Sequence, residues 1–68
     1  MLYVINVMKN GNYLFSTADE GIFCLEKLNE VYKVFEEKFT KEEGYKIIVM
    51  EHFVNGKIEI LNMDDMEN

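Results

Sequence analysis

The chain has no arginine, no proline and no tryptophan, and it has one cysteine and one histidine. One cysteine cannot form a disulfide within the chain, which fits a reducing compartment. All seven basic residues are lysines, so the chain lacks the basic, arginine-rich stripe with which proteins usually bind phosphates and bases. We therefore expect no direct binding of DNA or RNA.

Long apolar runs are also missing. None approaches the length of a membrane span, and Met1-Leu2-Tyr3 lacks the basic start of a signal peptide. We therefore expect a cytoplasmic protein that does not bind membranes. The 68 residues are enough for one domain, expected at residues 1–63, and the acidic residues 64–68 are expected to form a frayed tail.

Acidic residues outnumber basic residues by 13 to 7, which gives a formal net charge of −6. A surface with this charge repels nucleic acids and attracts basic partners. Hydrophobic residues make up 49% of the chain, more than one helix on a small sheet can cover. The composition therefore favours binding to a basic protein and leaves self-association open.

Two Asn-Gly pairs, at positions 10–11 and 55–56, each lie between runs of alternating apolar residues, the pattern of a β-hairpin. Between them, apolar residues recur every three or four positions from Ile22 to Phe39, which predicts one amphipathic helix. The fold class is therefore α+β with the order ββαββ. Because antiparallel pairing is commoner, we expect a four-stranded, mainly antiparallel sheet in the order 2-1-3-4, with the helix packed on one face.

The expected helix starts at Thr17, which forms a capping-box pattern with Glu20. It has about 22 residues, or roughly 33 Å, and is followed by an irregular turn that stops at Gly44. A stripe of apolar residues along it is expected to face the sheet.

Two-residue turns would place Lys9 opposite Asn12 and Val54 opposite Lys57. The second register puts His52 directly across from Glu59. The residues of the second hairpin then expected to face the helix are Tyr45, Ile47, Val49, Phe53, Ile58 and Ile60.

Catalytic and metal-binding patterns are weak. His52 with Glu59 could form a base and its orienting group, but no nucleophile lies at a matching spacing. Cys24, expected near the start of the helix, is more often a structural thiol than a nucleophile. The acidic tail lacks the spacing of a calcium loop, and the glycines are scattered rather than gathered in a phosphate loop. We therefore expect no enzyme, no metal and no cofactor.

The carboxylates of the helix are a first candidate for a partner-binding site. A row of carboxylates can resemble a phosphate backbone to a basic groove, although interleaved lysines are also typical of an ordinary solvated helix. The candidate acidic helix face consists of Glu26, Glu30, Glu36 and Glu37.

The sheet face away from the helix is a second candidate, because both faces of the first hairpin are apolar. We expect this outer face to carry a dimer or partner interface formed by Val4, Met8, Tyr13, Phe15, Met50 and Leu61. If the other face of the first hairpin meets the helix, the residues of that hairpin that point outward are instead Tyr3, Ile5, Val7 and Leu14. A few apolar residues exposed singly are also common on proteins without such an interface.

The small size, the lysine, asparagine, isoleucine and glutamate bias, the missing arginine and proline, and the acidic charge resemble the orphan proteins of phages and mobile elements from AT-rich bacteria. Some of those proteins bind and inhibit host defence enzymes, including CRISPR nucleases. The resemblance is one of bulk composition and assigns no functional residue.

Two hypotheses follow. In the first, the chain is a non-enzymatic inhibitor that binds a basic, nucleic-acid-handling enzyme through its helix carboxylates. In the second, it is a homodimeric accessory or structural protein whose interface is the outer face of the sheet.

Overall fold

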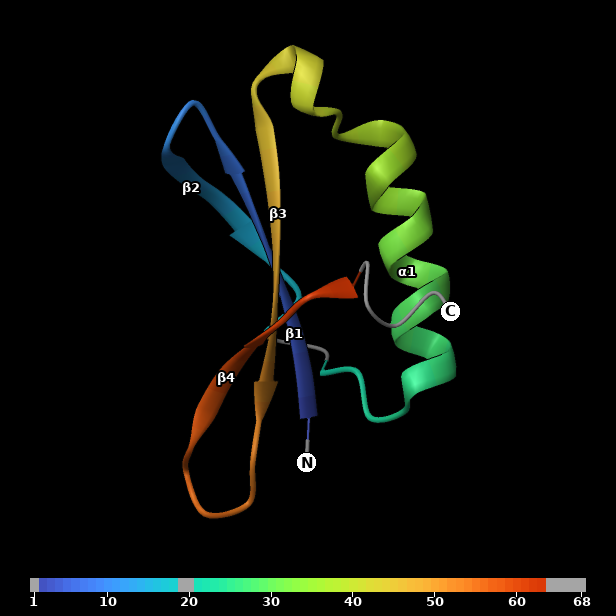
Figure 1. Cartoon of the computed structure of the whole chain (residues 1–68), viewed down its shortest axis with the longest axis vertical. Helices are drawn as coiled ribbons and strands as arrows, with labels where there is room; N and C mark the ends of the chain where they lie inside the picture. The colour runs from blue at the N-terminus through green and yellow to red at the C-terminus, as the bar shows by residue number, and fades with distance from the viewer. Residues whose placement is uncertain (1, 19–20, 64–68) are drawn as a thin grey trace.

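The computed structural model describes residues 2–18 and 21–63, and the expected tail at residues 64–68 lies outside them. The elements are β1 (Leu2–Lys9), β2 (Asn12–Ser16), α1 (Leu25–Lys38), the 3-10 helix η1 (Lys41–Glu43), β3 (Tyr45–His52) and β4 (Ile58–Leu61). The strands form one antiparallel sheet, and α1 lies along one of its faces (Figure 1). This confirms the α+β class and the ββαββ order.

The sheet has the predicted strand order, β2-β1-β3-β4. Its centre is the pairing of β1 with β3, which joins eight residues of each strand from Leu2 opposite His52 to Lys9 opposite Tyr45. These two strands are rich in β-branched and aromatic residues, which favour extended backbone.

The far edge of β1 is paired beyond the end of β2. The Thr17 backbone N–H donates to the Ile5 carbonyl at 3.0 Å, and the Thr17 Oγ1 accepts from the Ile5 N–H at 3.0 Å. Tyr3 and Ile22 then exchange two backbone hydrogen bonds, of 2.7 and 3.2 Å. The predicted capping role of Thr17 is therefore wrong, because its hydroxyl completes the hydrogen bonding of β1.

This edge pairing also shortens the helix. With Ile22 held beside β1, α1 begins at Leu25, and the N-cap residue Cys24 makes no side-chain capping bond. The helix has 14 residues, about 21 Å at 1.5 Å per residue, and not the predicted 22. Glu20, the other half of the predicted capping box, lies outside the described residues.

The first hairpin turns through Asn10 and Gly11, whose φ angles are 52° and 84°. The predicted pairs Lys9–Asn12 and Met8–Tyr13 are present, but a bulge follows, so Phe15 and not Leu14 lies opposite Val7. The prediction that Phe15 lies on the outer face is therefore wrong. The bulge turns the Phe15 ring to the helix side, where it buries more apolar surface than Leu14 would.

The second hairpin is one residue out of the predicted register. The Phe53 N–H donates to the Lys57 carbonyl at 2.8 Å, and the Gly56 N–H donates to the Phe53 carbonyl at 3.0 Å. The loop between Phe53 and Lys57 therefore has three residues, and Gly56 adopts a φ of 91°, as in a hairpin closed by a bulge. As a result His52 lies opposite Ile58, and the predicted His52–Glu59 pair is wrong.

A shift of one residue moves every side chain of β4 to the other face of the sheet. Leu61 lies opposite Val49 and packs against the core, so its predicted place on the outer face is wrong. Ile58 and Ile60, predicted to face the helix, point outward and are 53% and 74% exposed.

The hydrophobic core lies between α1 and the sheet. Ile5, Leu28 and Val49 are fully or almost fully buried there, and Met63 closes the cluster beside β4. Val31, Tyr32, Phe35, Ile47 and Leu61 pack around these residues.

Gly44 connects η1 to β3 and lies against the first hairpin. It caps η1 in the left-handed conformation with φ 93°, and its carbonyl accepts the Asn10 N–H at 2.9 Å. A Cβ at this position would collide with Oδ1 of Asn10. Glycine is thus required here for two reasons, the positive φ and the close approach of the Asn10 side chain.

We predict that Gly44→Ala lowers the free energy of unfolding by about 2–3 kcal/mol, because it adds a steric clash to backbone strain. Urea denaturation followed by circular dichroism measures the loss. The matched control is Gly11→Ala, which has a similar φ of 84° but no atom within 4 Å of the added Cβ. It should cost only about 1 kcal/mol. Equal losses in the two variants would contradict a role for the Asn10 contact.

Candidate functional site

The edge of β3 that faces β4 is only half covered. β4 pairs with Val49–His52, the second half of β3. Along the first half, from Tyr45 to Ile48, no strand among the described residues pairs with this edge. β1 covers the opposite edge of β3 along its whole length. On this side the Tyr45 N–H already donates to the Thr40 carbonyl at 3.1 Å, so the backbone left without a strand partner is that of Ile47.

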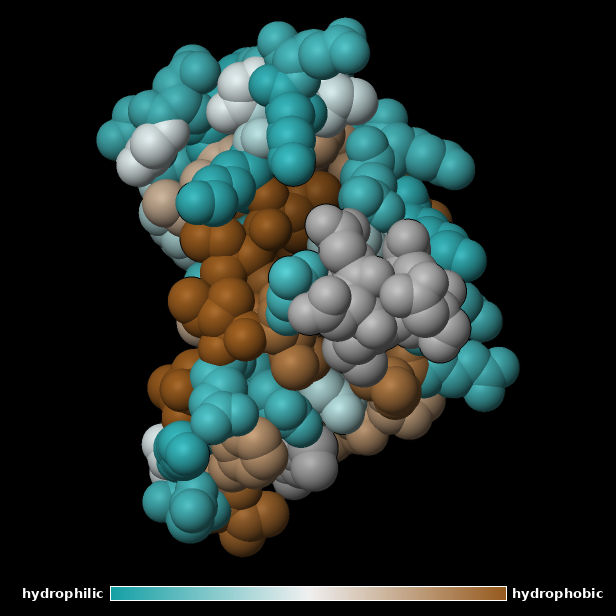
Figure 2. Space-filling model, in the orientation of Figure 1, coloured by the Kyte–Doolittle hydropathy of each residue, from teal (hydrophilic) through white to brown (hydrophobic). Residues whose placement is uncertain are grey.

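A cleft of about 410 Å³ lies beside this open edge, between β3, the end of β4 and the second half of α1. Figure 2 shows hydrophobic residues gathered over β3 and β4 and bordered by hydrophilic residues toward the η1 end. The side chains from the sheet include Ile47 and Leu61, and those from α1 include Tyr32 and Glu36. Met63, which follows β4, also lines the cleft. The cleft is therefore apolar at its base and charged at its rim.

Phe39 fixes the helix wall of the cleft. It caps the end of α1, where its N–H donates to the Phe35 carbonyl at 2.7 Å. Its ring makes edge-to-face contacts with Phe35, Phe15 and Tyr45, at centroid distances of 5.6, 5.5 and 5.1 Å. Because these rings come from α1, β2 and β3, the cluster holds three elements in one arrangement.

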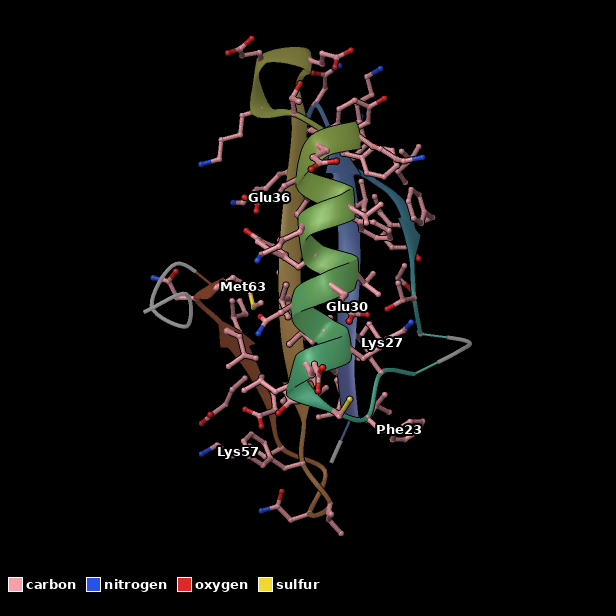
Figure 3. The ribbon with its side chains drawn as sticks, turned by 90° about the vertical axis from the view of Figure 1, so that its right-hand side faces the viewer. Phe23, Lys27, Glu30, Glu36, Lys57 and Met63 are labelled. Atoms are coloured by element: carbon pink, nitrogen blue, oxygen red, sulfur yellow. The ribbon has the colours of Figure 1, made fainter. Side chains whose placement is uncertain are left out.

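The four predicted glutamates of the helix do not share one face. Glu26, Glu30 and Glu37 follow at steps of four and seven residues, so they lie on one side of α1. Glu36 is one residue from Glu37 and therefore about 100° around the helix. It lines the cleft, whereas Glu30 points away from the sheet, as Figure 3 shows. The predicted acidic face thus divides into an outer group of three and one carboxylate at the cleft.

The outer group is not neutralised by neighbouring lysines. Glu26, Glu30 and Glu37 are exposed, and in residues 2–18 and 21–63 no lysine forms an ion pair with any of them. The one ion pair found in that part of the chain joins Lys57 to Glu59 at 3.1 Å, in β4 and its turn. The three outer carboxylates are therefore free to meet a partner.

On the outer face of the sheet, Met8, Tyr13 and Met50 lie as predicted, because Met8 pairs with Tyr13 and Met50 pairs with Val4. Val4 points to this face but is 4% exposed, so it offers almost no surface. Phe15 and Leu61 lie on the helix side, for the reasons given above. The register of β4 adds Ile58 and Ile60 to the outer face, and Ile60 lies directly opposite Met50.

The residues considered for catalysis are not brought together. His52 lies between Leu2 and Ile58, and its enclosed Nε2 has no hydrogen-bond partner among the described residues. Cys24 is exposed at the start of α1. Within the described residues, no three His, Cys, Asp or Glu side chains are grouped so that they could hold a metal ion. His52 and Cys24 therefore form no shared group with each other within the described residues.

The cleft is the feature that the sequence interpretation missed. The cleft exists because β3 has eight residues and β4 has four, a difference that is seen only in the structure. The sequence interpretation assumed a two-residue turn between two strands of similar length, so it predicted no open edge.

Comparison of the chain with protein-family models, with curated proteins and with solved structures finds no match. Among the described residues, no helix has the length and apolar character that crossing a membrane requires.

We predict that Phe39→Ala lowers the free energy of unfolding by about 2–4 kcal/mol, because it removes three ring contacts and leaves a cavity at the helix end. Chemical denaturation measures the effect. Phe23→Ala is the matched control, because Phe23 is 75% exposed and should change stability by less than about 0.5 kcal/mol. Similar losses in both variants would show that the aromatic cluster does not hold the wall of the cleft.

Proposed function

We propose that this protein is a small, non-enzymatic binding module that recognises a basic protein surface through Glu26, Glu30 and Glu37 of α1. The observation that carries the proposal is that these three carboxylates are exposed on one side of the helix and form no ion pair with a described lysine. Carboxylates that form no internal ion pair are available to a basic surface of a partner.

The proposed partner is a cytoplasmic, nucleic-acid-handling enzyme. Such an enzyme has a basic groove for phosphates, and a line of carboxylates on a helix presents the same sign of charge to that groove. Inhibition would follow from occupation of the groove. The compositional resemblance to phage and mobile-element proteins makes a host defence enzyme, such as a CRISPR nuclease, the favoured class of target.

We predict that reversing the three outer charges, in E26K/E30K/E37K, weakens partner binding by more than about tenfold, because attraction becomes repulsion. A tagged pull-down from nuclease-treated lysate, at low and high salt with mass spectrometry, identifies the partner. Binding of the purified pair is then measured by calorimetry. The wild-type interaction should weaken as salt rises, since exposed charges are screened.

The control carries the same charge change elsewhere, in E42K/E43K/E59K, whose three carboxylates are exposed on η1 and β4. It should retain most of the affinity, and circular dichroism should show that both variants are folded. Equal loss of binding in both variants would mean that only net charge matters and would contradict a site on α1.

A homodimer formed through the outer face of the sheet is a second candidate function. It is favoured by the apolar side chains there, of which Ile60, Tyr13 and Ile58 are 74%, 61% and 53% exposed. Met8 and Met50 extend this surface across β1 and β3. Such a face fits a two-fold interface in which sheets pack against each other.

We predict that the wild-type chain sediments as a dimer at high micromolar concentration and that Ile60→Lys makes it monomeric, because a buried lysine is costly at an apolar interface. Analytical ultracentrifugation measures the mass. Val54→Lys is the control, since Val54 is 92% exposed in the β3–β4 turn and lies outside the outer face. A wild-type monomer at every concentration would exclude this candidate.

A further inference from the structure

We propose that the open edge of β3 and the cleft beside it bind an extended peptide segment of a partner protein by strand addition. The segment would pair with the backbone of Ile47, on the side where β4 leaves β3 uncovered and beyond the bond from the Tyr45 N–H to the Thr40 carbonyl. It would place one apolar side chain in the cleft of about 410 Å³. This site goes beyond the proposed function, because it does not use the outer face of α1.

The backbone of Ile47 points to the open edge. Hydrogen-bonding groups alternate sides along a strand. The Gly44 carbonyl accepts from Asn10 on the β1 side, whereas the Phe53 N–H donates to Lys57 on the β4 side. Odd-numbered residues of β3 therefore direct their N–H and C=O toward β4, and Ile47 is the odd residue in the middle of the uncovered half. An unpaired edge of this kind is the recognition element of strand addition.

The side chains around the edge define the peptide. A peptide residue opposite Ile47 faces α1 and enters the apolar base of the cleft, next to Leu61 and Met63. The next residue lies opposite Lys46 and points to the outer face, where an acidic side chain is complementary. The third residue receives no hydrogen bond from the Tyr45 N–H, which already donates to the Thr40 carbonyl. Its side chain faces α1 again, where Glu36 lines the cleft and a lysine or arginine is complementary.

Glu36 and Lys46 are both exposed, and neither forms an ion pair with another described residue. Their charges are therefore available to select the peptide. Running antiparallel to β3, the segment reads from its N-terminus as apolar, acidic, basic. The apolar and basic residues are two positions apart, because side chains alternate along a strand and only every second one reaches the cleft.

The test is selection of a displayed library of random linear dodecapeptides on the full-length chain, followed by synthesis of the most enriched peptide. We expect the apolar–acidic–basic order in the enriched sequences and saturable binding by fluorescence polarisation. In amide NMR spectra the peptide should shift the Ile47 resonance. Absence of enrichment above background would overturn the proposal.

Backbone methylation of the peptide separates strand addition from ordinary apolar binding. N-methylation of the residue that fills the cleft should weaken binding by about tenfold or more, because its N–H faces β3. N-methylation of the next, acidic residue should have little effect, because its N–H points away. Equal effects at the two positions would overturn pairing with the β3 edge.

The protein variants Glu36→Lys and Glu37→Lys form a matched pair, since they make the same charge change at adjacent exposed positions. Glu36→Lys should weaken peptide binding several-fold, and Glu37→Lys should not. Binding of the proposed basic partner through Glu26, Glu30 and Glu37 should instead be weakened by Glu37→Lys and not by Glu36→Lys. Equal sensitivity would overturn the cleft as the binding site. The chain without peptide is also tested for a dimer that Glu36→Lys dissociates. Such a dimer would show that a second copy of the chain occupies the edge, and it would overturn the proposal.

Discussion

The hydrogen bonding of β1 on both edges is the constraint on which the rest of the structure depends. β3 pairs with its whole length on one side. On the other side the partners are β2, then Thr17, then Ile22. Buried backbone groups must be paired, and Tyr3, Val4 and Ile5 are all buried. The segment after β2 therefore follows β1 before it can turn into a helix.

This route determines where the helix and the cleft lie. Because Ile22 is held beside Tyr3, α1 begins only at Leu25 and ends at Lys38. Its aromatic residues then meet Phe15 and Tyr45 at the η1 end of the sheet. At the same end β3 extends past the last pair with β4, which leaves an open strand edge beside the cleft. The cleft and the open edge follow from the unequal lengths of β3 and β4.

The charges lie on separate surfaces. Three glutamates on the outside of α1 suit a basic protein groove, while Glu36 and Lys46 lie beside the open edge of β3. The outer sheet face is apolar and carries Ile58 and Ile60. In the part of the chain that the structure describes, these surfaces share elements: α1 carries both the outer glutamates and Glu36, and β3 carries both the open edge and Met50.

The fold class, the ββαββ order and the strand order could be predicted from the sequence, because hydrophobic periodicity and turn residues are local signals and antiparallel pairing then leaves one favourable arrangement. The sequence also predicted charged residues on the helix, but not that Glu36 lies at the cleft, apart from the other three glutamates. The start of α1, the bulge that turns Phe15 inward and the register that exposes Ile60 depend on the tertiary structure. Those features depend on which backbone groups and side chains compete for the same partners, and such competition acts between segments far apart in the sequence.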